Sequence, residues 1–140
     1  MPTTMYFVTF DCHDPVRLAE FWATALSYEV DGRNREFGEI AITDPKGVGL
    51  PILFITVPEG KTAKNRMHFD LLAEAPFEAE VERLVAAGAR ALETHQDPDG
   101  YEGPHVWTVM QDPEGNEFCV GEPLSGRPLR PTSDGERASP

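Results

Sequence analysis

Basic residues are scarce in this sequence of 140 residues, where 12 lysines and arginines stand against 24 aspartates and glutamates and the formal net charge is −12. Lysine and arginine form no run, so a phosphate backbone would be repelled and we expect no nucleic acid partner. No apolar run approaches the ~20 residues that cross a bilayer, and no basic segment followed by an apolar one opens the chain. The sequence therefore predicts a cytoplasmic protein with no membrane span and no signal peptide.

Cysteine is also scarce, since the chain contains only Cys12 and Cys119, which lie far apart and form no CxxC pair. Reduced thiols on strands are the interpretation that this spacing favours, with a disulfide as the alternative. Hydrophobic residues, at 40%, are numerous enough to build a core. A length of 140 residues then fits one domain or two small fused modules.

The stretch 105–121, HVWTVMQDPEGNEFCVG, is the most informative part of the chain. Alternating residues flank the turn sequence Asp112-Pro113-Glu114-Gly115-Asn116, in which Pro113 fixes φ and Gly115 can adopt a positive φ. This pattern predicts a β-hairpin. A similar sequence, Asp44-Pro45-Lys46-Gly47, lies between two other β-rich runs, so we predict that the chain uses one structural unit twice.

The first predicted unit begins with a strand and a helix. Aromatic and β-branched residues predict a strand over residues 5–11 that is covered on both faces and central in its sheet. Asp14 is a good N-cap and Pro15 suits the first helical position, so a helix is predicted over residues 15–26. Three further strands are predicted over residues 28–30, 37–43 and 50–57.

The second predicted unit repeats this order after a linker over residues 58–65, which are polar and include a proline and a glycine. It contains a strand over 66–73, a helix over 76–88, a strand over 89–94, a loop over 96–104 and the hairpin. Residues 1–122 then form one domain of two modules, at about 4–57 and 66–121. Residues 123–140, rich in proline, serine and arginine, are predicted to form a flexible tail.

Three motifs occur in a fixed order along these units: Phe21-Trp22-Ala23-Thr24-Ala25-Leu26, Met67-His68-Phe69-Asp70-Leu71 and Asp112-Pro113-Glu114-Gly115-Asn116-Glu117-Phe118. In this order they resemble the vicinal oxygen chelate superfamily and, within it, the small glyoxalase-like domains of the glyoxalase, bleomycin resistance protein and dioxygenase type. The resemblance covers about residues 5–122. It implies an α+β fold of two βαβββ modules that form a U-shaped mixed sheet, with the ligand in the concave cleft, the helices on the convex side and a homodimer as the usual assembly.

The resemblance also implies where a metal would bind. In metal-dependent members of the superfamily, strands of both modules supply three or four ligands, and the matching positions here are Phe7, Phe54, His68 and Cys119. Phenyl rings cannot coordinate a cation, whereas a divalent metal in such a site needs about three nitrogen or oxygen donors. We therefore expect no divalent metal centre and no other cofactor, although the His68–Cys119 pair could hold a soft metal weakly.

Strand alternation predicts what the cleft offers instead. Residues that share parity with Phe7 and His68 are expected to face the cleft, and those of the other parity to pack beneath the helices. The cleft set is Met5, Thr9, Asp11, Arg66, Asp70, Glu117 and Cys119, and the core set is Tyr6, Val8, Phe10, Met67, Phe69, Leu71, Phe118 and Val120. The expected cleft has an apolar floor of Phe7, Ile52 and Phe54, a polar group of His68, Asp70 and Cys119, and Trp107 as a flat stacking wall.

Three functions are consistent with this cleft. The first is metal-independent binding of a small, partly apolar organic ligand by Phe7, Phe54, Arg66, His68, Trp107 and Cys119. The second is a metal-independent lyase or isomerase in which His68, oriented by Asp70, transfers a proton and only Arg66 is available to stabilise an oxyanion. The third is an interaction module that uses sheet edges and the tail.

The proposed site residues also have plainer interpretations. A strand histidine beside an aspartate is often a satisfied hydrogen-bonding pair, which would explain His68 and Asp70 without catalysis. Cys119 fits a small buried hydrophobic position. Trp107 fits the core or a dimer interface as well as it fits a ligand wall.

Overall fold

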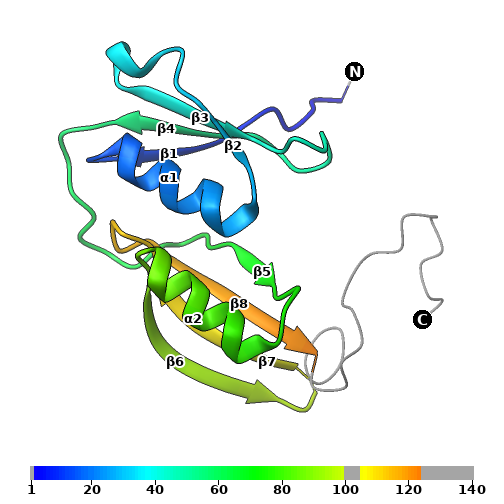
Figure 1. Cartoon of the computed structure of the whole chain (residues 1–140). Helices are drawn as coiled ribbons and strands as arrows, with labels where there is room; N and C mark the ends of the chain where they lie inside the picture. The colour runs from blue at the N-terminus through cyan, green and yellow to red at the C-terminus, as the bar shows by residue number, and fades with distance from the viewer. Residues whose placement is uncertain (1, 100–104, 124–140) are drawn as a thin grey trace.

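The structure is a computed structural model that describes residues 2–99 and 105–123. Two βαβββ modules follow one another along the chain (Figure 1). The first consists of β1 (Val8–Cys12), α1 (Pro15–Leu26), β2 (Glu29–Asp31), the short 3-10 helix η1 (Arg35–Phe37), β3 (Glu39–Thr43) and β4 (Ile52–Thr56). The second consists of β5 (Asp70–Leu72), α2 (Phe77–Ala87), β6 (Arg90–Asp97), β7 (His105–Gln111) and β8 (Glu117–Pro123). The predicted α+β fold with a duplicated unit is confirmed.

Each module forms a mixed four-stranded sheet, with strand orders β1-β4-β3-β2 and β5-β8-β7-β6. In both, the first and last strands of the module run parallel and the other pairs are antiparallel. The prediction that the first strand is central and covered on both faces is wrong, because β1 lies at the edge of its sheet and Thr9 and Asp11 are exposed. Its one aromatic residue, Phe10, packs against the shared core.

The two helices begin and end close to where the sequence predicts. The Asp14 carboxylate accepts a hydrogen bond of 3.2 Å from the backbone N–H of Arg17, and Ser27 ends α1 in a left-handed conformation. Gly88, with φ of 123°, follows the last residue of α2. Among the described residues, no helix has the length and apolar character needed to cross a bilayer.

One aromatic core joins the modules. Trp22 of α1 is 1% exposed and its ring contacts those of Phe69 and Phe118, which belong to the second module. The strand parity predicted for Phe69 and Phe118 is confirmed. Tyr6 and Met67, expected in the same core, are 79% and 87% exposed, and this expectation is wrong because both residues precede the start of their strands.

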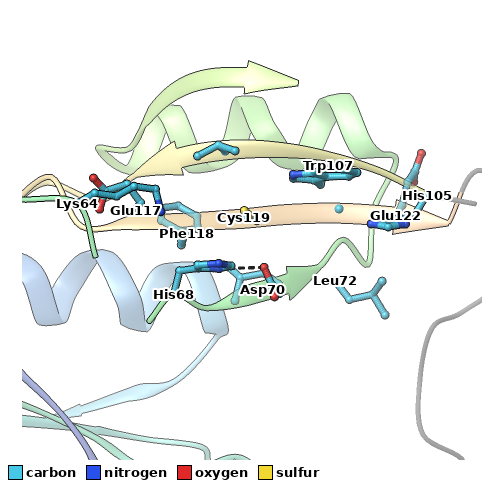
Figure 2. Close-up of a pocket in the computed structure, with 13 residues that line it drawn as sticks. Lys64, His68, Asp70, Leu72, His105, Trp107, Glu117, Phe118, Cys119 and Glu122 are labelled. Carbon is cyan, nitrogen blue, oxygen red and sulfur yellow. Dashed lines mark ion pairs between the residues drawn. The ribbon is translucent and has the colours of Figure 1, made fainter. Parts of the chain in front are cut away.

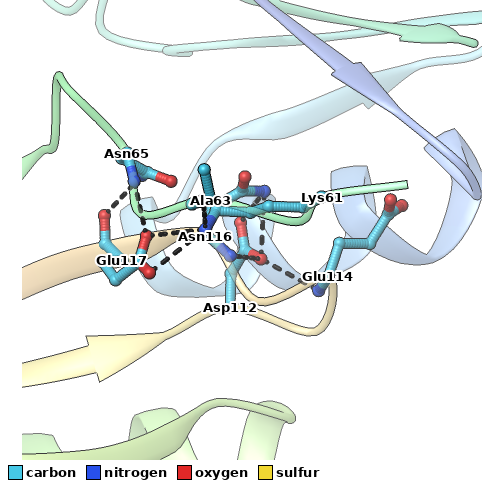
Figure 3. Close-up of polar contacts among 7 residues, drawn as sticks. All are labelled: Lys61, Ala63, Asn65, Asp112, Glu114, Asn116 and Glu117. Carbon is cyan, nitrogen blue, oxygen red and sulfur yellow. Dashed lines mark hydrogen bonds and ion pairs between the residues drawn. The ribbon is translucent and has the colours of Figure 1, made fainter. Parts of the chain in front are cut away.

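The turn between β7 and β8 also reaches the first module (Figure 3). The Glu114 carboxylate accepts hydrogen bonds from the backbone N–H groups of His13, at 2.6 Å, and Asp14, at 2.8 Å, just before α1. Next to it, the Glu117 carboxylate holds the linker through Asn65 and Lys61. Of the predicted tail, only Pro123 lies within the described residues, where it ends β8, and the end of the predicted 96–104 loop lies outside them.

Candidate ligand-binding pocket

A pocket of about 680 Å³ lies on the helix-free face of the second sheet (Figure 2). Its walls come from β5, β7 and β8, with His68 just before β5 and Lys64 from the linker. Alternation along β7 explains which side chains reach it: Val106, Thr108 and Met110 are buried in the core, and the residues between them face the pocket. The same alternation on β8 buries Phe118 and Val120 and turns Glu117, Cys119 and Gly121 toward the pocket face.

A polar corner of the pocket is formed by His68, Asp70 and Cys119. Nδ1 of His68 lies 3.2 Å from Oδ1 of Asp70, and Asp70 is the register partner of Cys119 across the parallel β5–β8 pair. Burial, and then the nearby Asp70 carboxylate, raises the pKa of the Cys119 thiol to about 11. The thiol is therefore protonated at neutral pH, as expected for a small neutral side chain and not for a nucleophile.

Trp107 forms the apolar wall of the pocket. Its ring lies against those of His105, with centroids 4.7 Å apart, and His95, with centroids 5.3 Å apart. Its register partner on β8 is Gly121, where an added Cβ would come within 2.7 Å of the Val106 carbonyl oxygen and 3.1 Å of the Trp107 Cβ. Only glycine therefore fits at position 121, so the strand next to the Trp107 indole carries no side chain there.

Several residues predicted for the cleft lie elsewhere. Phe54 is 0% exposed and stacks on Phe10 in the core, so its placement on the cleft floor is wrong, and so is that of Ile52, which is 4% exposed. The reason is register, because Phe54 pairs with Phe10 and therefore shares its face. Phe7 is half-buried against Tyr6, and neither Phe7 nor Arg66 lines the pocket.

The donor set does not fit the metal centre of the superfamily that the sequence resembles. Phe7 has no donor atom, and the helix-free face of β4 offers only apolar Leu53 and Ile55. Within the described part of the chain, His68, Asp70 and Cys119 are the group whose possible ligand atoms come together, within 4.8 Å of one another. All three belong to the second module, so the four-position set drawn from both modules is not reproduced.

Sequence reasoning missed several residues that line the pocket: Lys64, Leu72, His105, Val109, Gly121 and Glu122. The signal for Gly121 was present, because an isolated glycine in a strand marks a close approach of another group. The face of the sheet on which Trp107 and His105 lie can be predicted only when the first and last residues of β7 are known.

Comparison with known proteins agrees with this architecture. Residues 7–121 match the family model described as glyoxalase-like domain. No curated protein matches the sequence. Among solved structures, the chain is similar to a glyoxalase/bleomycin resistance protein/dioxygenase family enzyme from Burkholderia phytofirmans PsJN, with 16% identity, a TM-score of 0.66 and coverage of 84% of this chain and 97% of that one.

Two other solved structures give the same result. A glyoxalase/bleomycin resistance protein/dioxygenase from Nocardioides has 16% identity and a TM-score of 0.65, covering 94% of this chain and 91% of that one. A glyoxalase-related enzyme from Fulvimarina pelagi has 20% identity and a TM-score of 0.62, covering 86% and 88%. At these identities the structures show the fold alone, while the family model spans most of the chain. The protein belongs to the glyoxalase-like domain family, within the vicinal oxygen chelate superfamily.

Proposed function

We propose that this protein binds a small, partly apolar organic ligand in the pocket of the second sheet, without the divalent metal centre of metal-dependent superfamily members. The composition of the pocket supports this most directly. Its volume of about 680 Å³ falls in the usual range for small-molecule sites, ~300–1,000 Å³. Leu72, Trp107 and Val109 offer apolar surface beside the polar corner, which is the combination that holds an organic ligand in one orientation.

Metal analysis of the purified protein, with a thermal melt before and after a chelator, tests the metal-independent part of the proposal. We expect no stoichiometric metal and an unchanged melting temperature. One equivalent of a divalent ion whose removal lowers the melting temperature would overturn it.

A thermal-shift screen of small organic compounds tests the binding. A ligand of the folded state raises the melting temperature in a saturable way. We expect hits whose effect is lost in Trp107→Leu and retained in Leu53→Ala, a matched change on the helix-free face of the first sheet. Hits that are equally affected by both changes would place binding elsewhere.

A metal-independent lyase or isomerase is the second candidate, favoured by the 3.2 Å contact between His68 and Asp70. The carboxylate can orient the imidazole for proton transfer to a ligand in the pocket. Arg66, the residue predicted to stabilise an oxyanion, does not line the pocket, which weakens this candidate. Loss of turnover in His68→Ala with an unchanged melting temperature would favour the enzyme. Ligand binding that is unchanged in His68→Ala, with no turnover in the wild type or in any variant, would favour a binding protein.

The proposal also includes a homodimer in the cytoplasm. The dimer is supported by the exposure of large apolar side chains, among them Tyr6, Val48 and Met67. The cytoplasm is supported by Cys12 and Cys119, which are both free and form no disulfide with each other. Light scattering coupled to size exclusion tests the assembly. Twice the chain mass over a range of concentrations is expected, and a monomer at all of them contradicts the dimer.

A further inference from the structure

Three residues form one row across the pocket. Leu72 on β5 is the register partner of Gly121 on β8, and Gly121 is the register partner of Trp107 on β7. Figure 2 shows Trp107 and Leu72 on opposite sides of β8. Since neighbouring strands lie ~4.8 Å apart, the backbones at Leu72 and Trp107 are separated by roughly 9.6 Å, with no side chain between them. We call this gap, bounded by Leu72, Gly121 and Trp107, the slot.

The packing of the sheet keeps the slot open. A Cβ at position 121 would approach the Val106 carbonyl oxygen to 2.7 Å, and this oxygen is backbone and cannot swing away. The imidazoles of His95 and His105 lie against Trp107 with ring planes within 26° of the indole plane. Such neighbours limit the rotation of the indole, so the wall of the slot is preorganised.

The width of the slot favours a flat occupant. Carbon atoms in contact are ~3.5–4.0 Å apart, so a single aromatic ring between the two walls uses most of the available gap. A saturated ring is thicker and has no π face of its own, so it gains less against the indole, whereas an aromatic ring gains both buried area and stacking.

The polar corner adjoins the slot, because Asp70 and Cys119 form the register pair two positions before Leu72 and Gly121, on the same face of the sheet. Its hydrogen-bond acceptor is the Asp70 carboxylate, whose side chain is 75% exposed, pairs with His68 and is hydrogen-bonded by the Cys119 thiol, which leaves further lone pairs open. Cys119 offers a neutral thiol. A ligand that reaches this corner from the slot is therefore met by a carboxylate with free acceptor capacity.

The charges around the pocket also favour a ligand with a hydrogen-bond donor over an anionic ligand. Among the residues that the structure describes, its lining includes the carboxylates of Asp70, Glu117 and Glu122 and one lysine, Lys64. Glu117 is matched by Lys61 outside the lining, at 3.0 Å, which leaves a surplus of negative charge beside the slot in a chain whose net charge is −12. A carboxylate on the ligand would be repelled.

We propose that the slot takes a planar aromatic ring that carries a hydrogen-bond donor such as an amine, with the ring between Leu72 and Trp107 and the donor at Asp70. This inference rests on the proposed function, because it names the class of ligand for the same pocket. It makes Leu72, Gly121 and Trp107 the residues that select ring shape and Asp70 the residue that selects the polar group.

Three compounds separate these requirements: benzylamine is flat and carries a donor, cyclohexylmethylamine has the same donor on a saturated ring, and benzoate has the flat ring with a carboxylate. Tryptophan fluorescence and calorimetry report on their binding. Trp22 is 1% exposed and serves as the internal background, so saturable quenching that disappears in Trp107→Leu locates the ring at the slot. We expect benzylamine to bind at least about tenfold more tightly than either of the other two.

Variants then test each wall and the corner. Leu72→Ala is expected to weaken benzylamine about fivefold, while Leu53→Ala, on the other sheet, leaves its affinity unchanged. Asp70→Asn is expected to remove the preference for the amine over benzoate. Equal affinity for benzylamine and cyclohexylmethylamine overturns the slot, and equal affinity for benzylamine and benzoate overturns the acceptor corner.

The failure of this inference is distinguishable from the failure of the proposed function. If none of the three compounds binds but the broader thermal-shift screen yields ligands that depend on Trp107, the ligand class is wrong and the binding function stands. If the screen also yields no ligand that depends on Trp107, both are wrong.

Discussion

The indole Nε1 of Trp22 donates a hydrogen bond of 3.0 Å to Oδ2 of Asp112, which lies 90 residues further along the chain. Both residues are buried, with 1% and 4% exposure. Oδ1 of Asp112 accepts from the backbone N–H groups of Glu114 and Asn116, at 2.9 and 3.0 Å, so one carboxylate shapes its own turn and binds the helix of the other module. Burial raises the pKa of Asp112 although these hydrogen bonds oppose the rise.

Replacing this carboxylate should cost much of the stability of the fold. Asp112→Ala leaves the Trp22 N–H and two turn amides without an acceptor, and we expect the free energy of unfolding to fall by ~2–4 kcal/mol. Urea denaturation followed by circular dichroism measures this. Asp44→Ala is the matched control in the equivalent turn of the first module, where the carboxylate binds only exposed or half-buried backbone amides, and a smaller loss is expected. Equal losses would contradict a special role for the Trp22–Asp112 contact.

Glu114 is predicted to stabilise the start of α1 from a distance of about 100 residues in sequence. Its carboxylate accepts from two backbone amides at the positive end of the helix dipole, so Glu114→Ala should lower the free energy of unfolding by ~1–2 kcal/mol. Glu114→Gln keeps the shape of the side chain and removes its charge, so its free energy of unfolding should lie between those of the wild type and Glu114→Ala. Glu82→Ala, on the exposed face of α2, serves as the control, and a loss equal to that of Glu114→Ala would argue against the capping role.

The ion pair between Glu117 and Lys61 should make the free energy of unfolding depend on pH in the acid range. Burial alone would raise the pKa of Glu117, but the Asn65 N–H and the Lys61 ammonium group together hold it at about 2, below its usual value of 4.5. A carboxyl group whose pKa is lowered on folding stabilises the protein above its unfolded pKa, and this contribution is lost as the pH falls through the folded pKa.

The difference in unfolding free energy between the wild type and Glu117→Gln should therefore be largest at neutral pH and shrink as the pH falls from about 4.5 to about 2. Urea titrations at a series of pH values measure this difference. Glu122→Gln, on the same strand, is the control. A difference that stays constant over this range would show that the ion pair does not act as described.

Gly121 is predicted to be intolerant of any side chain. In Gly121→Ala the new Cβ meets the Val106 carbonyl oxygen at 2.7 Å, so β7 and β8 must separate locally, at a cost of ~1–3 kcal/mol. Gly60→Ala, where nothing lies within 4 Å of the added Cβ, is the control and should be close to neutral. Thermal melts of both variants measure the effect, and an unchanged melting temperature in Gly121→Ala would contradict the close approach.

Local patterns were sufficient to predict the helices and the hairpin, because Asp14, Pro15 and the turn at 112–116 act on their own neighbours. The cleft was predicted less well, because the face on which a strand residue lies depends on the register with a partner strand. Phe54 illustrates this: one position of error in aligning β4 with β1 moves the side chain from the helix-free face to the core.

The pocket itself depends on pairings that no local pattern reports. Leu72, Gly121 and Trp107 are separated by long stretches of sequence, and only the β5–β8 and β7–β8 registers place them in one row. The residue at which a strand begins also decides which side chains are buried. Strand alternation alone would bury Met67, but β5 begins at Asp70, so Met67 lies before the strand and is exposed.

The contacts of the β7–β8 turn with α1 have a consequence for the order in which the chain can fold. During synthesis α1 leaves the ribosome about 100 residues before Glu114 and 90 residues before the acceptor of the Trp22 indole. Until then the two backbone N–H groups just before α1 lack their acceptor, and its tryptophan lacks both its polar partner and the rings of Phe69 and Phe118. The first module is therefore made first but completed last, and nascent chains that stop before the final hairpin should be the ones that chaperones and proteases recognise.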